Sequence, residues 1–168
     1  MTMGNQWSYK PDDQYKTSTQ LIHLLVDIVA KGGNFLLNIG PSPQGELPPD
    51  SLRRLKEIGD WMQVNGSAIY STRPIAPYKE GVICFTCMPG GGINAIYLAG
   101  EQEKQLPSQI EIKSFCPAGG TQVKLLGVTS PLKWDRHGRG VLIHVPGSVQ
   151  GNPPCRHAWT FQIEKPEM

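Results

Sequence analysis

The chain has 168 residues, of which 39% are hydrophobic and 18% charged, and its formal net charge is +2. This length is enough for one domain or for two small ones. The charge is small and dispersed, with no basic run longer than Arg53-Arg54, which argues against a nucleic-acid-binding protein. No apolar stretch is long enough to predict a membrane-spanning helix. The 19 glycines and 15 prolines predict many turns and short strands.

The first predicted element is a helix that begins near Thr17. Thr17 and Gln20 have the spacing of a capping box, in which each side chain accepts a hydrogen bond from the other residue's backbone N–H. Gly32-Gly33 ends the helix. The apolar residues recur at helical spacing and are expected to form its buried face: Leu21, Leu24, Leu25, Ile28 and Val29.

A short apolar run at 35–39, bounded by glycines, predicts a strand buried on both faces, as in a parallel sheet flanked by helices. A loop at 40–45 leads to Pro48-Pro49-Asp50, where a second helix begins and continues to Asn65-Gly66. One strand between two helices has no pairing partner, so we expect sequence upstream of this chain to complete the sheet. The predicted buried face of the second helix comprises Leu52, Leu55, Ile58 and Met62, with Trp61 beside them.

After residue 73 the pattern is all-β. Glycine-rich turns separate short apolar or alternating runs at regular spacing, which is typical of an antiparallel β-sandwich. The predicted strands are 82–87, 94–99, 109–113, 122–127, 132–135, 141–145 and 158–163.

The four cysteines are predicted to be free thiols. Cys84 and Cys87 have the spacing of a metal-binding pair, but they lie on a predicted strand, where residues three apart point to opposite faces. Cys116 and Cys155 are isolated in the sequence and do not complete a set of four ligands. We therefore expect no metal and no other cofactor.

A string of motifs runs through the first 72 residues and includes Gly33-Asn34-Phe35-Leu36-Leu37-Asn38-Ile39-Gly40-Pro41, then Trp61 and Asn65-Gly66. This string resembles the α-L-fucosidases of glycoside hydrolase family 29. Those enzymes have Gly-Asn-x-Leu-Leu-Asn-x-Gly-Pro, followed by a helix that ends near Trp-x-x-x-Asn-Gly-Glu-Ala-Ile-Tyr. Ser67 stands where the family usually has Glu. The resemblance covers residues 4–72 closely and 73–168 only in architecture. The matching residues are Gly4, Trp7 and Tyr9, then Gly33-Asn34-Phe35-Leu36-Leu37-Asn38-Ile39-Gly40-Pro41, then Gly45, Arg54-Leu55, Ile58-Gly59, Trp61, Asn65-Gly66 and Ala68-Ile69-Tyr70.

The resemblance implies an α/β plus all-β chain: residues 1–72 are the last α-β-α units of a catalytic (β/α)8 barrel, and residues 73–168 are an antiparallel β-sandwich. It implies a retaining exo-α-L-fucosidase, which uses a carboxylate nucleophile and a carboxyl acid/base to release terminal fucose from fucosylated glycans. In the family both carboxyls lie upstream of the stretch present here. We therefore match no catalytic residue in this chain and expect it to be inactive alone.

Trp7 and Asn38 are the candidate substrate-binding residues that the resemblance implies. Asn38 is placed near the end of the last barrel strand, and Trp7 follows the family's acid/base, where an aromatic ring could stack on fucose. In the alternative readings, Asn38 hydrogen-bonds loop backbone and Trp7 only covers the barrel rim. The loop acids Asp12, Asp13 and Glu46 are expected to be solvated. The histidines have no nucleophile partner, and His23 is expected to be a packed or surface residue.

A second hypothesis is a noncatalytic β-sandwich module that binds carbohydrate or stabilises a partner. Because the two helices expose apolar faces in either case, we expect fraying or self-association through the barrel residues. No leader segment is recognised at the N-terminus. Family analogy suggests a secreted, periplasmic or lysosomal protein.

Overall fold

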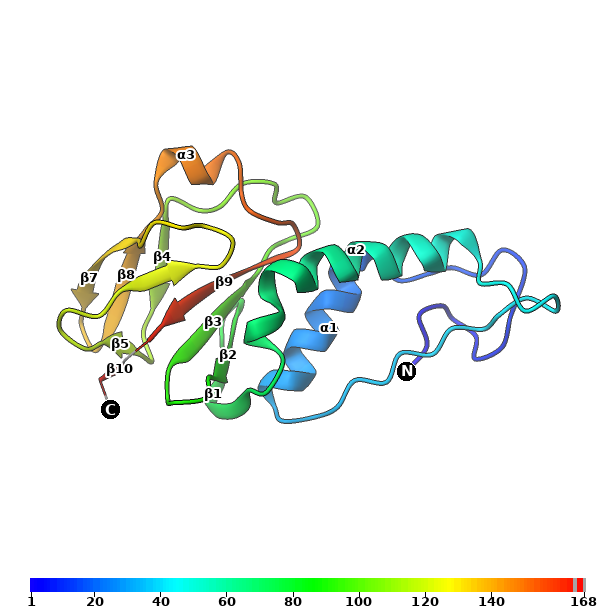
Figure 1. Ribbon diagram of the computed structural model, residues 1–168, viewed down its shortest axis with the longest axis horizontal. Coiled ribbons are helices and arrows are strands. Elements are labelled where there is room, and N and C mark those ends of the chain that lie inside the picture. The colour runs from blue at the N-terminus through cyan, green and yellow to red at the C-terminus, as the bar shows by residue number, and fades with distance from the viewer. Residues whose placement is uncertain (165, 168) are drawn as a thin grey trace.

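The computed structural model describes residues 1–164 and 166–167 (Figure 1). The helices are α1 (Ser18–Ala30), α2 (Pro49–Asn65), the 3-10 turn η1 (Gly66–Ala68) and the short α3 (Gly147–Gln150). The strands are β1 (Arg73–Glu80), β2 (Ile83–Cys87), β3 (Ile93–Leu98), β4 (Gln109–Ile112), β5 (Cys116–Pro117), β6 (Val123–Leu125), β7 (Lys133–His137), β8 (Gly140–His144), β9 (Ala158–Ile163) and β10 (Pro166–Glu167).

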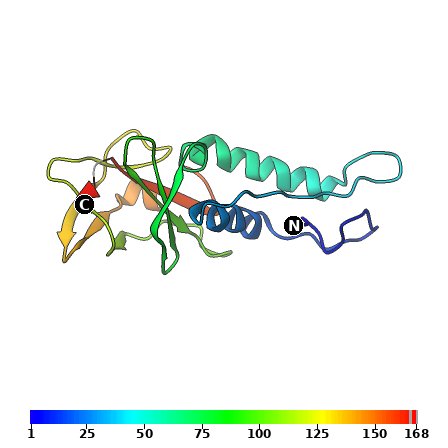
Figure 2. The same cartoon turned by 90° about the horizontal axis from the view of Figure 1, so that it is seen from below.

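Within the described residues the strands form a five-stranded sheet, β1-β2-β3-β9-β6, a three-stranded sheet, β4-β8-β7, and the pair β10-β5. All strand pairs are antiparallel, as the turn spacing predicts. Figure 2 shows the three-stranded sheet and the two long helices on opposite sides of the five-stranded sheet. The core between the two larger sheets is built from alternate residues of their strands, among them Phe85, Ala95, Ile112, Val141, Ile143, Trp159 and Phe161.

Helix α1 begins with the predicted capping box. The Thr17 hydroxyl accepts from the Gln20 amide at 3.1 Å, and the Gln20 side-chain oxygen accepts from the Thr17 amide at 3.0 Å. The buried face is turned from the predicted one: Leu24, Ile28 and Val29 are only half-buried. Instead, α1 packs on the outer face of the five-stranded sheet, in a second core that contains Ile22, Val26, Ala30, Trp61, Ala68, Cys84, Ile96, Leu98 and Ala158.

The predicted buried face of α2 is wrong in the helix's N-terminal half. Leu52 and Leu55 are 51% and 38% exposed, whereas Trp61 is 2% exposed. Ile58 and Met62 are half-buried against the second core. In its N-terminal half α2 turns another side inward: Ser51 is fully buried there, whereas Leu52 and Leu55 face away from the described chain.

The predicted buried strand at 35–39 is also wrong as a sheet strand of this chain. It makes one isolated parallel bridge, between Thr2 and Asn38, and Leu36 is 77% exposed. The amide of Asn38 donates to Met1 O at 2.9 Å and the amide of Met3 donates to Asn38 O at 3.0 Å. The segment is extended, but a single short neighbour on one side cannot bury it.

Strand β1 was not predicted because Pro74 and Pro77 argue against a strand. It forms the edge of the five-stranded sheet, where missing N–H groups are tolerated, and its register with β2 shifts between Pro74 and Lys79. The two-residue strands β5 and β10 and the helix α3 were also missed, because elements this short leave no periodicity. Cys84 and Cys87 lie on opposite faces of β2, as their spacing predicts.

Buried polar side chains line the helix-facing side of the five-stranded sheet. Thr86 donates to Ala68 O at 2.9 Å, Asn94 donates to Thr86 Oγ1 at 3.0 Å, and Gln162 donates to Asn94 Oδ1 at 2.9 Å. Thr160 donates to Asn65 Oδ1 at 2.8 Å. Since buried polar groups are costly unless paired, this row fixes how the end of α2 and η1 sit on the sheet.

Candidate functional site

The two candidate substrate-binding residues lie together. The side-chain amide of Asn38 donates to the backbone oxygen of Trp7 at 2.8 Å. The Trp7 side chain is 67% exposed. The side chain of Asn38 therefore supports the loop that carries Trp7, which is the alternative that the sequence left open for Asn38.

Gly40 allows the two segments to approach each other. A Cβ at this position would overlap the backbone nitrogen of Tyr9 and would lie 2.6 Å from the carbonyl carbon of Ser8. Any other residue at Gly40 would therefore separate the 38–40 segment from the Trp7 loop. In Figure 1 these segments lie at the end of the molecule remote from the sandwich.

The three loop acids differ in their surroundings. The carboxylate of Asp13 accepts hydrogen bonds from backbone amides, including that of Gln14 at 2.9 Å. Asp12 lies in the left-handed region at φ 60°, and Glu46 is exposed on a turn in which its amide donates to Ser42 Oγ at 3.2 Å. Asp13 is thus bound to backbone rather than simply solvated as predicted.

A cavity of about 270 Å³ adjoins this loop and is lined by Tyr9, Lys10, Pro11, Asp12, Asp13, Tyr15, Pro48, Pro49 and Asp50. Burial raises the pKa of Tyr15 above its usual value of 10.0, and the nearby carboxylates of Asp13 and Asp50 raise it further. Tyr15 therefore stays a neutral hydroxyl near pH 7, in a cavity whose lining includes three aspartates.

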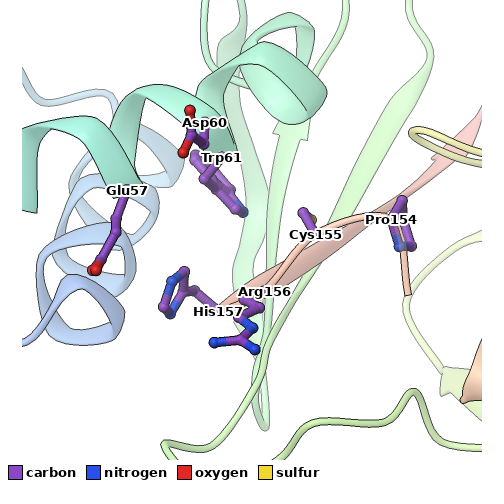
Figure 3. A pocket seen from close by; sticks show the side chains of 7 residues that line it. All are labelled: Glu57, Asp60, Trp61, Pro154, Cys155, Arg156 and His157. Carbon is purple, nitrogen blue, oxygen red and sulfur yellow. The ribbon is translucent and has the colours of Figure 1, made fainter. Parts of the chain in front are cut away.

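A second cavity, of about 200 Å³, lies where α2 meets the segment before β9 (Figure 3). Its lining residues are Glu57, Asp60, Trp61, Pro154, Cys155, Arg156 and His157. Burial raises the pKa of the Cys155 thiol, with the Asn65 side chain lowering it by a smaller amount. Sequence reasoning missed this cavity because it joins residues that are far apart in the chain, and no motif links them.

His157 connects this segment to α1. Its Nδ1 lies 2.8 Å from Thr19 Oγ1, and its backbone oxygen lies 2.9 Å from His23 Nε2. His157 has a φ of 75°, which is uncommon for a residue other than glycine. His23 is thus a packed histidine, as predicted, and His157 links α1 to the segment before β9.

The stability of the chain is expected to fall as the pH falls below the usual His pKa of 6.5. Burial lowers the pKa of His157, helped by Arg156 and His23 and opposed by Glu57 and Glu101. Below pH 6.5 the unfolded state therefore binds more protons than the folded state, and unfolding is favoured. His157→Asn, which tolerates the positive φ, should flatten the profile of unfolding free energy between about pH 7 and 5. Urea unfolding at several pH values measures the free energy of unfolding. Parallel pH profiles for the unsubstituted chain and the His157→Asn variant would contradict the prediction.

The remaining histidines lie on the exposed face of the three-stranded sheet. His144 Nε2 is 2.7 Å from Asp135 Oδ2, and His137 Nδ1 is 3.2 Å from Glu111 Oε1. In the described part of the chain the four cysteines are free, and no group of three or more His, Cys, Asp or Glu side chains is arranged to hold a metal ion. No helix in the same residues is both long and apolar enough to cross a membrane.

Comparison with known proteins identifies the family to which this fold belongs. The model of the α-L-fucosidase family matches residues 1–67, and that of the α-L-fucosidase C-terminal domain matches residues 93–164. Tissue α-L-fucosidase of Rattus norvegicus is 29% identical over 165 residues, which cover 95% of this chain and 35% of the relative. The α-L-fucosidase of Branchiostoma floridae is 33% identical over 154 residues, which cover 89% and 33%.

The crystal structure of Thermotoga maritima α-fucosidase in complex with fucose is similar, with a TM-score of 0.82 and 27% identity over 97% of this chain and 38% of that chain. The chain belongs to the α-L-fucosidase family, glycoside hydrolase family 29. It spans about a third of the length of the curated relatives it matches. The predicted fold class, the end of a (β/α)8 barrel followed by a β-sandwich, is confirmed.

Proposed function

We propose that this chain is the barrel end and sandwich of a retaining exo-α-L-fucosidase, which removes terminal α-L-fucose from glycans. The single observation that carries the proposal is the exposed indole of Trp7, on a loop supported by Asn38, in a chain that both fucosidase models match. An exposed aromatic face is suited to stack on the apolar face of a sugar ring. The similar Thermotoga maritima structure is a complex with fucose, which favours this ligand.

In this proposal residues 1–72 belong to the catalytic barrel and 73–168 to the sandwich. A retaining glycosidase needs two carboxyl groups about 5–5.5 Å apart on either side of the scissile bond. We match neither of them to this chain, and we expect its part in catalysis to be substrate binding by Trp7 with Asn38 behind it. The backbone hydrogen bonds of Asp13 are in keeping with this, because they leave its carboxylate poorly placed to attack a substrate.

The test is release of the aryl alcohol from an aryl α-L-fucoside. The chain alone should release no more than a heat-treated control. We also expect turnover by a fusion protein in which this chain replaces the matching 38% of the Thermotoga maritima chain, with the anomeric configuration of the released fucose retained. In that fusion, Trp7→Ala should raise KM more than it lowers kcat. A folded fusion without turnover would count against the proposal. Turnover by the chain alone would make Asp12, Asp13 and Glu46 the carboxylates to replace.

The second candidate is a noncatalytic carbohydrate-binding or structural module. The observation in its favour is that α1 and the end of α2 share a core with the five-stranded sheet, as expected if the sandwich stabilises the helices. The two candidates differ in the assay above, since only the first predicts turnover by the fusion. In both, the exposed Leu36, Leu52 and Leu55 are proposed to favour self-association, which light scattering on the same preparation would detect as a mass above that of the monomer.

A further inference from the structure

The loop that carries Trp7, defined here as residues 2–9, wraps around one carboxylate. Asp13 accepts from the backbone amide of Asn5 at 3.1 Å to Oδ2 and 3.2 Å to Oδ1, and from that of Gln6 at 3.3 Å. The loop comes so close that a Cβ at Gly4 would overlap Asp13 Oδ2 and lie 2.9 Å from Asp13 Cγ. The N–H groups immediately before Trp7 therefore point at a negative charge.

The carbonyl groups of the same loop point at a positive charge. The ammonium group of the half-buried Lys16 lies 3.0 Å from Thr2 O and 3.3 Å from Gly4 O. The backbone of Lys16 is fixed as well: its amide donates to Met3 O at 3.0 Å, and its carbonyl accepts from Arg54 Nε of α2 at 3.0 Å. Lys16 thus links the Trp7 loop to a helix.

The backbone amides of the loop thus donate to the negatively charged Asp13, and its backbone carbonyls accept from the positively charged Lys16. Hydrogen bonds to charged partners are about twice as strong as those between neutral groups. Such a clamp restricts an irregular loop that has no sheet or helix to order it. Asn38 adds a third support, at the carbonyl of Trp7 itself.

We propose that Asp13 and Lys16 are positioning residues that hold the Trp7 loop in the one conformation that presents its indole to a sugar. The sugar's identity as fucose rests on the proposed function; the positioning of the indole does not. Asp13 and Lys16 act through Trp7 and do not themselves touch the ligand.

The experiment is ¹⁹F NMR of the whole chain labelled with 5-fluorotryptophan. The chain has four tryptophans, Trp7, Trp61, Trp134 and Trp159, and Trp7→Phe assigns the signal of interest. Asp13→Asn should shift or broaden the Trp7 signal alone. It should also speed amide exchange at Asn5 and Gln6 by about tenfold, because the charged acceptor is lost.

Asp13 and Lys16 each have a matched control, a residue of the same type in the same segment of the chain. Asp12→Asn, at a position where positive φ suits asparagine, should leave all four signals unchanged. Lys16→Met should reproduce the Asp13→Asn change in the Trp7 signal. Lys16→Arg should keep the Trp7 signal of the unsubstituted chain, because a guanidinium can also donate to two carbonyls. Lys10→Met, at an exposed lysine of the adjacent segment, should have no effect.

An unchanged Trp7 signal in both Asp13→Asn and Lys16→Met would overturn the proposal. Movement of all four tryptophan signals would do so too, because it would mean that the clamp is needed for folding rather than for placing one side chain. Titration of the unsubstituted chain with L-fucose tests the proposed function separately. A shift of the Trp7 signal supports fucose as the ligand; no shift counts against fucose and leaves the clamp to be judged by the variants.

Discussion

Replacing Trp61 with alanine is expected to lower the free energy of unfolding by about 3–5 kcal/mol, which is the usual cost of truncating a buried tryptophan. The side chain is 2% exposed and lies in the core between α2 and the five-stranded sheet. Its indole nitrogen donates to Ala158 O at 2.9 Å, so truncation both opens a cavity and leaves that carbonyl with the weaker Cys155 thiol donor at 3.2 Å. Urea unfolding followed by circular dichroism measures the loss.

Trp7→Ala is the matched control, because the same residue type is 67% exposed at that position. It should change the free energy of unfolding by no more than about 0.5 kcal/mol. Equal losses for the two variants would contradict the packing of α2 on the sheet, since that packing alone distinguishes the two tryptophans.

Gly140→Ala is expected to lower the free energy of unfolding by about 1–3 kcal/mol, which is the usual cost of forcing an extra carbon into a closely packed site. Gly140 begins β8, where a Cβ would overlap the carbonyl oxygen of Ile112 and lie 2.6 Å from Lys113 Cα. Both obstacles are backbone, so the end of β4 has to move away from β8. Hydrogen exchange should therefore speed up most in β4 (Gln109–Ile112).

The control for this substitution is Gly147→Ala, where an added Cβ meets no atom within 4 Å. Gly147 is the first residue of α3, and alanine is a better helix former than glycine, so we expect no loss of stability. If Gly140→Ala were as harmless as Gly147→Ala, the close approach of β4 to β8 would be wrong.

Local patterns predicted the elements whose signals lie within a few residues. The capping box at Thr17 and the alternation in 109–113 depend on neighbours along the chain, and both correspond to observed features. The missed edge strand β1 is the converse case, because its prolines are tolerated only where a sheet ends, and the sequence does not state where that is.

The site was predictable only in part, since its geometry depends on contacts between distant segments. The family motifs selected Trp7 and Asn38, and the structure brings them together. The hydrogen bonds from backbone amides to Asp13 were not predicted, because a carboxylate in a polar loop has the same sequence pattern whether it faces water or backbone amides. The exposure of Leu52 was missed because apolar spacing predicts a face, not what covers it.

The contact between α1 and the end of the chain has a consequence for biosynthesis. His23 Nε2 lies 2.9 Å from the backbone oxygen of His157, 134 residues further along, so α1 leaves the ribosome long before β9, one of the elements on which it packs. Synthesis proceeds at about 5–20 residues per second, so during that interval α1 can pack on α2, β1 and β2 while its contacts with β9 are still missing. A ribosome that stalls before Ala158 would therefore hold a chain in which α1 has α2, β1 and β2 beside it but is still exposed where β9 belongs, and chaperones that bind apolar segments would find that gap.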